Sequence, residues 1–195
     1  MEPVLNFLNS IAPLEEGLRD YLSSVLKTTN PPKDTILLRE GSILRTIGFI
    51  EKGLIRGFKK MDNGSEKTTF FMKEGDVFVS VRSYFRQIPA KEALETLEPC
   101  IIDSITYSQY KQALKRYPSF HEHRAELLEK YYVLGDEREE MRQQHYVYDR
   151  FCYLVTHYPD LIDRVPDKFL ASFIGTSSSY FSNLKSQYKD GNRSI

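Results

Sequence analysis

The sequence is poor in cysteine, and the two cysteines that it contains, Cys100 and Cys152, lie far apart along the chain. Two distant thiols are too few for a disulfide framework or for the ligand set of a zinc site. They are also too few to hold an iron–sulfur cluster. Each cysteine lies within an apolar stretch, so we expect both to be thiols of the hydrophobic core.

Long apolar runs and an excess of charge of either sign are also missing. No apolar run approaches the roughly 18 residues of a membrane span, and the first residues, MEPVLNFLNS, lack the order of a signal peptide. We therefore expect a cytoplasmic protein.

The 27 Lys and Arg residues balance the 27 Asp and Glu residues, which argues against a uniformly basic protein that binds any nucleic acid. The segment from Arg164 onward nevertheless holds five basic and two acidic residues, so it can form a local basic patch.

Signatures of catalysis and metal binding are absent as well. His121 and His123 lie two residues apart on a predicted helix and point to different faces, and His145 and His157 have no second ligand at metal-binding spacing. The sequence contains no phosphate-binding loop, no dinucleotide fingerprint and no complete acyl-enzyme motif. We therefore expect no metal, no other cofactor and no enzymatic activity.

What is present is a globular composition with a change of periodicity along the chain. Hydrophobic residues make up 41% of the 195 residues, which allows one large or two small folded domains. Pro13–Lys27 has helical spacing of its apolar residues, and short runs of β-formers separated by glycine-containing turns follow it. This pattern is typical of an antiparallel barrel or jelly roll. The predicted strands are Thr35–Leu38, Ile47–Glu51, Leu54–Lys60, Thr68–Met72, Val77–Val81 and Cys100–Ile105.

Helical signals follow the last predicted strand. Thr106 with Gln109, and Ser119 with Glu122, have the capping-box spacing, so we expect a helix to begin at each place. In the second helix, apolar residues recur at spacings of four, three and seven, as in the seam of a coiled coil. Both dimerisation along this helix and packing of the helix on the protein's own barrel remain open. The seam residues are Leu127, Tyr131, Leu134 and Met141.

These changes divide the sequence into three predicted parts. Residues 1–118 are expected to form the jelly-roll domain and residues 119–145 a dimerisation or linker helix. Residues 146–195 are expected to form a helical domain, which opens with an aromatic-rich helix from Tyr146 to Tyr158.

The segment from Val165 to Gln187, VPDKFLASFIGTSSSYFSNLKSQ, predicts a helix-turn-helix. Pro166 suits the first turn of a helix, and Gly175 supplies the left-handed turn that ends it. Ser177 can cap the second helix, and the apolar residues of both helices recur at the spacing of one inner face. A helical hairpin that serves only for packing remains the alternative. The residues expected to face outward are Ser178, Ser179, Ser182, Asn183 and Lys185.

The whole chain resembles the cyclic-AMP-receptor and fumarate-nitrate-reductase superfamily of bacterial transcription regulators, especially the variant common in Bacteroidetes. The resemblance rests on LLREGSILRTIGFIEKGLIRGF from Leu37, TTFFMKEGDVF from Thr68 and YPDLIDRVPDKFLASFIGTSSSYFSNLK from Tyr158. It implies an α+β fold with an N-terminal cyclic-nucleotide-binding jelly roll, a long dimer helix and a C-terminal helix-turn-helix domain. It also implies double-stranded DNA and a second copy of the chain as partners, with RNA polymerase as a further candidate.

The ligand cassette of that family departs from its pattern in this chain. In the family, a Gly-Glu step and an Arg-Ser-Ala run hold the sugar and the phosphate of a cyclic nucleotide. Here Val79-Ser80 and Lys91-Glu92-Ala93 stand at those places, within GDVFVSVRSYFRQIPAKEALETLE from Gly75. Lys lacks the bidentate geometry of Arg, and Glu92 would bring a negative charge beside the phosphate. We therefore expect no bound cyclic nucleotide at the candidate pocket residues Ser80, Arg82, Lys91 and Glu92. Arg82 and Arg86 could hold a different anion, but two arginines on an exposed loop are more often solvated.

The predicted recognition helix is nearly neutral. Asn183 can pair with adenine through two hydrogen bonds, and the serines can bond to a base or to a phosphate. Phosphate contacts are expected from Lys168, Lys185, Lys189 and Arg193, whereas a full wing after this helix is not expected. The sequence thus favours a DNA-binding regulator, and the alternative is a sensor or protein-interaction module that keeps the fold without binding DNA.

Overall fold

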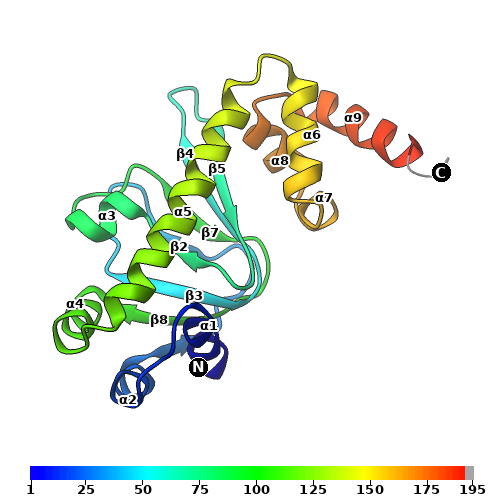
Figure 1. Cartoon of the computed structure of the whole chain (residues 1–195). Helices are drawn as coiled ribbons and strands as arrows, with labels where there is room; N and C mark the ends of the chain where they lie inside the picture. Colours follow the sequence, from blue (N-terminus) through cyan, green and yellow to red (C-terminus); the bar gives the residue numbers. More distant parts are fainter. Residues whose placement is uncertain (192–195) are drawn as a thin grey trace. The chain divides into compact units, whose positions relative to one another are not determined.

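The computed structural model describes residues 1–191 and divides the chain into two compact units (Figure 1). The first unit comprises Met1–Lys59 and Phe70–Lys130, and the second comprises Lys60–Thr69 with the residues from Tyr131 onward. None of the described helices combines the length and the apolar character that a membrane crossing requires.

Two four-stranded sheets lie at the centre of the first unit (Figure 1). Their strand orders are β1-β8-β3-β6 and β2-β7-β4-β5, and neighbouring strands such as β3 and β8 pair in antiparallel fashion. The predicted α+β class with an antiparallel β-sandwich is therefore confirmed. The strands are β1 (Lys27–Thr29), β2 (Ile36–Leu38), β3 (Thr46–Lys52), β4 (Ile55–Lys60), β5 (Glu66–Met72), β6 (Val77–Phe78), β7 (Ala93–Thr96) and β8 (Ile101–Thr106).

The register of β3 and β8 decides which side chains share a face. Ile47 pairs with Ile105, and Phe49 with Asp103, so these four side chains lie on one face of the sheet. Helices α1 (Glu2–Ile11), α2 (Glu16–Val25) and α4 (Tyr107–Arg116) supply the apolar side chains that pack against this face. On the opposite face, Gly48 allows close packing, because a Cβ atom there would lie 2.2 Å from the ring of Phe78.

Five elements of the first unit differ from the sequence prediction. The strand predicted at Val77–Val81 ends at Phe78, and Val81–Arg86 forms the short helix α3. This helix buries Ser83 and Tyr84, and the Ser83 hydroxyl accepts a hydrogen bond from the Leu44 backbone N–H at 2.8 Å, a tertiary contact that alternation of residues cannot reveal. Helix α1 and strands β1 and β7 were not predicted, since the two strands are only three and four residues long.

One of the two predicted capping boxes is confirmed. The hydroxyl of Thr106 accepts from the Gln109 backbone N–H, and the Gln109 side chain accepts from the Thr106 backbone N–H at 2.8 Å. The second capping box is wrong. The Ser119 hydroxyl is buried and has no hydrogen-bond partner among residues 1–191, because the Glu122 backbone N–H donates to the Ser119 carbonyl instead, at 3.1 Å.

Helix α5 (Phe120–Gln143) contains the predicted seam. The residues at the two ends of the seam pack within the chain itself. Leu127 packs on the core of the first unit, and Met141 is only 1% exposed. Tyr131 and Leu134 are half-buried. The large apolar side chains that α5 exposes lie one residue away from the seam, which sequence spacing alone did not predict. They are Leu128, Tyr132 and Val133, at 42%, 78% and 49% exposure.

The second unit is mainly helical. Its helices after α5 are α6 (Val147–His157), α7 (Leu161–Arg164), α8 (Asp167–Ile174) and α9 (Ser178–Gly191). The end of the β4–β5 hairpin, Lys60–Thr69, which includes the first residues of β5, also belongs to this unit. Ser172 on α8 accepts from the Thr68 backbone N–H at 2.9 Å and donates to the Glu66 carbonyl at 2.9 Å. The Ser172 hydroxyl therefore joins α8 to the hairpin through one accepted and one donated hydrogen bond.

Candidate nucleic-acid interface and effector pocket

The turn between α8 and α9 forms as the sequence predicts. Gly175 has φ 72° and ψ 49°, a left-handed conformation that costs a glycine little because it has no Cβ atom. The Thr176 backbone N–H donates to the Ala171 carbonyl at 2.9 Å, and the Gly175 backbone N–H donates to the same carbonyl at the end of α8. Ser177 then accepts from the Tyr180 backbone N–H at 3.2 Å, which is the expected cap of α9.

The inner faces of α8 and α9 pack on α6. Phe181 is fully buried, and its ring lies 5.6 Å from that of Phe151 on α6. Ala171, which is 1% exposed, provides the small side chain that close packing of helices requires. Arg150 on α6 donates from Nε to the Ile174 carbonyl at 2.7 Å and so satisfies a further carbonyl at the end of α8. The two helices are thus held at fixed positions by a third.

The outer face of α9 exposes a row of short polar side chains. Ser178, Ser179 and Asn183 are all exposed. Within residues 1–191, neither Ser178 nor Asn183 uses its side chain in a hydrogen bond, whereas Ser179 contacts the Ser177 hydroxyl at 3.2 Å. Tyr180, 46% exposed, lies beside them and was not among the predicted contact residues.

Two of the lysines predicted to contact phosphate are already paired with carboxylates. The Lys185 ammonium lies 2.8 Å from Asp167 Oδ1, and only 20% of its side chain is exposed, so the expectation of an outward Lys185 is wrong. Ser182 is exposed but donates to the other oxygen of Asp167 at 2.6 Å. The Lys189 ammonium lies 2.6 Å from Asp163 Oδ1 on α7. These partners lie outside α9, which is why the spacing within that helix did not predict them.

The lysines also affect the acidity of their partners. For Asp167, burial raises the pKa, but the hydrogen bonds from Lys185 and Ser182 outweigh it and leave the pKa below the usual value. For Asp163, the hydrogen bond from Lys189 and the charge of that lysine lower the pKa. Both carboxyl groups are therefore ionised at neutral pH, and both hold their lysines.

Lys168 differs from the other predicted phosphate contacts. It is exposed, its ammonium lies 4.6 Å from the centre of the Phe169 ring, and it forms no ion pair with any residue from 1 to 191. Its charge is available to a phosphate group. Arg193 and the expectation that no full wing follows α9 lie outside the described residues.

The predicted effector-pocket residues do not converge as a cluster of cations. Ser80 is 3% exposed and donates to Glu92 Oε1 at 3.1 Å, so the carboxylate of Glu92 is held at the start of α3. Arg82 and Lys91 are exposed. Residues 1–191 contain no group of three or more His, Cys, Asp and Glu side chains suited to a metal ion.

A buried ion pair in the sandwich was not predicted. Arg56 on β4 is 1% exposed, and its Nη2 and Nε atoms lie 2.6 and 2.8 Å from Glu95 Oε1 on β7. The two residues are direct neighbours in the register, and the guanidinium stacks 4.2 Å from the centre of the Phe58 ring. The arginine inside the apolar strand LIRGF was the signal for such a pair.

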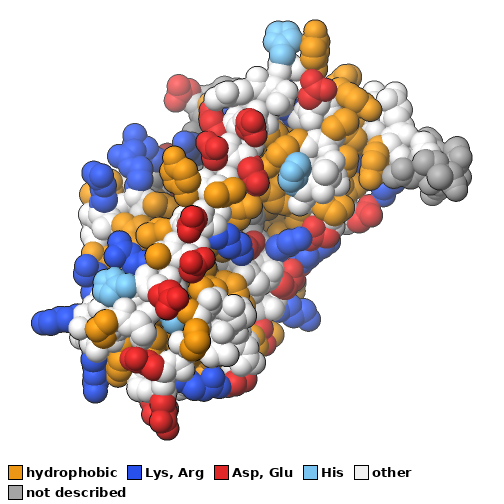
Figure 2. Space-filling model, viewed as in Figure 1, with side chains coloured by type: hydrophobic (Ala, Val, Ile, Leu, Met, Phe, Trp, Pro, Cys, Tyr) orange, Lys and Arg blue, Asp and Glu red, His pale blue; other side chains and the backbone are white. Residues whose placement is uncertain are grey.

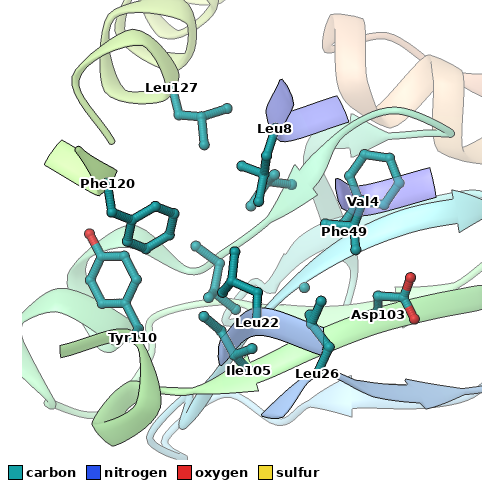
Figure 3. Close-up of a pocket in the computed structure, with 13 residues that line it drawn as sticks. Val4, Leu8, Leu22, Leu26, Phe49, Asp103, Ile105, Tyr110, Phe120 and Leu127 are labelled. Carbon is teal, nitrogen blue, oxygen red and sulfur yellow. The ribbon is translucent and has the colours of Figure 1, made fainter. Parts of the chain in front are cut away.

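A small apolar cavity of about 80 Å³ lies between the β3–β8 face and the helices of the first unit (Figure 3). Figure 3 shows Leu8, Leu22, Phe120 and Leu127 around it, with the Asp103 carboxylate at its edge. Asp103 is 1% exposed and accepts from the Thr28 hydroxyl at 2.5 Å. The cavity lies on the outer side of this sheet and apart from the predicted effector residues around Ser80.

Comparisons with known proteins agree with this architecture. Residues 29–117 match the family model of the cyclic nucleotide-binding domain. No curated protein matches the chain at a significant level.

Solved structures similar to the whole chain are bacterial proteins of low sequence identity. A crp/fnr-family transcriptional regulator from Eubacterium rectale has a TM-score of 0.74 at 15% identity, with 95% of this chain and 88% of that chain covered. FixK2 from Bradyrhizobium japonicum has a TM-score of 0.72 at 13% identity, with 86% of each chain covered. The c-di-GMP-responsive global regulator CLP from Xanthomonas campestris has a TM-score of 0.69 at 14% identity, with 91% and 93% covered. Residues 29–117 therefore match the cyclic nucleotide-binding domain family, and the chain shares its fold with these solved regulators.

Proposed function

We propose that the protein is a sequence-specific DNA-binding transcription regulator. The observation that carries the proposal is the α8–α9 pair, which combines a left-handed turn at Gly175 with a capped second helix and an exposed polar row on that helix. In helix-turn-helix proteins, the N-terminal residues of the second helix contact base edges in the major groove. The global regulator CLP and the Eubacterium rectale regulator, which have the same fold, support this role.

Asn183 carries the direct reading of sequence in this proposal. Its side chain is exposed and makes no hydrogen bond with residues 1–191, so both its donor and its acceptor are available to the N6 and N7 edge of adenine. Ser178 and Ser179 add hydrogen bonds to bases or to phosphates. Lys168 supplies a charge to the phosphate backbone.

The regulator acts as a homodimer through α5 in this proposal. Tyr132 and Val133 are exposed by 78% and 49%, and Tyr131 and Leu134 lie beside them on the helix. Large apolar side chains grouped on a surface helix are typical of an interaction surface. Because Leu127 packs on the core of the first unit and Met141 is buried, the dimer contact falls to these neighbouring residues.

The effector domain does not bind cyclic nucleotides in this proposal. The Glu92 carboxylate, held by the Ser80 hydroxyl at 3.1 Å, places a negative charge where the family binds a phosphate. The cations of Lys91 and Arg82 do not compensate for this charge, because both side chains are exposed to solvent and neither is enclosed beside Glu92.

Selection of random genomic DNA fragments at low and moderate salt tests the proposal. The wild-type protein is expected to retain a defined set of fragments as the salt concentration rises, and added cyclic AMP is expected to leave that set unchanged. Asn183→Ala should broaden the set, because it removes a contact worth about 1–3 kcal/mol of discrimination between bases. Gln143→Ala, which removes an exposed amide from α5, serves as the control. Loss of all fragments at moderate salt, or no change on Asn183→Ala, would reject the assignment.

One observation favours a second candidate, a sensor or protein-interaction module that does not bind DNA. Lys185 and Lys189 are both neutralised by carboxylates, which leaves α9 with little positive potential. Under this alternative, the selection would recover the same fragments with and without the protein at every salt concentration.

A further inference from the structure

A groove on the first unit lies between α3, α4 and α5 and combines aromatic rings with basic side chains. It has a volume of about 270 Å³ and is lined by Phe85 on α3, by Tyr107 and Tyr110 at the start of α4, and by Arg124 on α5. A shallower depression of about 500 Å³ adjoins it and shares the side chains of Lys111 and Arg124. No acidic residue lines either hollow.

The positive charges of the groove have no internal partner. Lys111, Lys115 and Arg124 are exposed, and none of them forms an ion pair with any residue in the described part of the chain. Figure 2 shows that Lys and Arg side chains gather over α3 and α4. Unlike Lys185 and Lys189 on α9, these cations are free to bind an anion.

The apolar wall of the groove is fixed in position by ring contacts. The Tyr84 ring lies behind it, with its centre 5.3 Å from the rings of both Phe85 and Tyr107 and 5.8 Å from that of Tyr110. Tyr84 is fully buried, and its hydroxyl has no hydrogen-bond partner among residues 1–191. The wall is therefore an ordered aromatic surface, suited to the flat face of another ring.

The volume and the charge define the ligand class. Small-molecule pockets typically have volumes from about 300 Å³ upward. The groove, at about 270 Å³, lies at the small end of this range, so it fits a molecule of one or two fused rings rather than a dinucleotide. An anionic group on that molecule would lie against Lys111 and Arg124, and the guanidinium can contact a carboxylate, sulfonate or phosphate through two hydrogen bonds. A neutral aromatic compound would leave the cations unused.

We propose that this groove binds an aromatic anion, a molecule of one or two rings that carries a carboxylate, sulfonate or phosphate. The site is separate from the cassette residues around Ser80 and from α9. It gives the sensor domain a ligand chemistry that does not depend on a cyclic nucleotide.

Calorimetric titration of the full chain with 2-naphthoate tests the proposal without DNA. Naphthoate is expected to bind saturably. Two control ligands are expected to bind at least tenfold more weakly: 2-naphthamide, which has the ring but no charge, and acetate, which has the charge but no ring. Lys111→Gln and Arg124→Gln should each weaken naphthoate binding about tenfold, as expected for the loss of one charge-assisted contact. Arg116→Gln is the matched control, because Arg116 is an exposed cation of α4 that contacts the Tyr117 ring and does not line the groove.

The outcomes separate clearly. The proposal is overturned by absence of saturable naphthoate binding, or by equal affinities of the wild type and both groove variants. Equal binding of naphthoate and naphthamide would also overturn it, since the cations would then have no role. Thermal unfolding of each variant checks that it is folded, and the side chains of Lys111 and Arg124 are exposed enough for substitution to leave the core intact. Failure of DNA binding would leave this result unaffected.

Discussion

Asp163→Asn is expected to strengthen DNA binding and to make it more sensitive to salt. The Asp163 carboxylate holds Lys189 at 2.6 Å, with 44% of the lysine side chain and 73% of the aspartate side chain exposed. An exposed ion pair of this kind contributes little to stability, because water and salt screen it. Removal of the carboxylate therefore leaves the fold intact and frees one ammonium group of α9 for a DNA phosphate.

The magnitude follows from counterion release. Each additional phosphate contact adds about 0.9 to the slope with which log K falls against log salt. When salt rises from about 50 to about 200 mM, one new phosphate contact multiplies the loss of affinity by about 3.5, and two contacts in a dimer multiply it by about 12. The affinity at low salt should rise, and the advantage over the wild type should shrink as salt increases.

Fluorescence anisotropy with a labelled fragment from the selection, at four or more salt concentrations, measures both quantities. Asp149→Asn is the control, since it makes the same change in net charge at an exposed position of α6 that holds no lysine. A salt slope for Asp163→Asn equal to that of Asp149→Asn would show that Lys189 does not reach the phosphate backbone. It would refute the reasoning that Asp163 competes with DNA for this lysine.

Three further predictions concern stability. Gly48→Ala should lower the free energy of unfolding by about 1–3 kcal/mol, because the new methyl group would meet the Phe78 ring at 2.2 Å. Gly135→Ala in α5, where nothing lies within 4 Å, should raise the free energy of unfolding by about 1 kcal/mol. Urea denaturation compares the two variants, and equal effects would contradict the packing argument. Ser177→Ala should cost about 1 kcal/mol through loss of the α9 cap, measured by thermal unfolding against Ser178→Ala, whose hydroxyl caps nothing. The lowered pKa values of Asp163 and Asp167 mean that their stabilisation is present above the unfolded value of about 3.9 and is lost as pH falls through the lower folded values. The wild type should therefore lose more stability between about pH 5 and pH 3 than the doubly substituted Asp163→Asn, Asp167→Asn protein, and parallel curves would exclude this contribution.

Local chemistry explains which parts of the structure could be predicted. Gly175 needs no partner to favour a left-handed turn, and the hydroxyl of Ser177 reaches a backbone group only three residues away. The same holds for the capping box of Thr106 and Gln109. The prediction failed after Phe78, where the strand ends early and helix α3 begins at Val81; a buried contact between Ser83 and Leu44, 39 residues apart, accompanies this helix.

The sequence by itself determined the change from strands to helices, the position of the α8–α9 turn and the polar row on α9, because each depends on side chains within a few residues of one another. Only the tertiary structure decided that Lys185 and Lys189 are held by carboxylates 18 and 26 residues away. It alone also decided that Leu127 packs on the core and Met141 is buried while Tyr132 is exposed, and that basic and aromatic side chains of α3, α4 and α5 share one groove. The physical reason is that charge pairing and burial depend on distance in space, which the chain sets only when it folds.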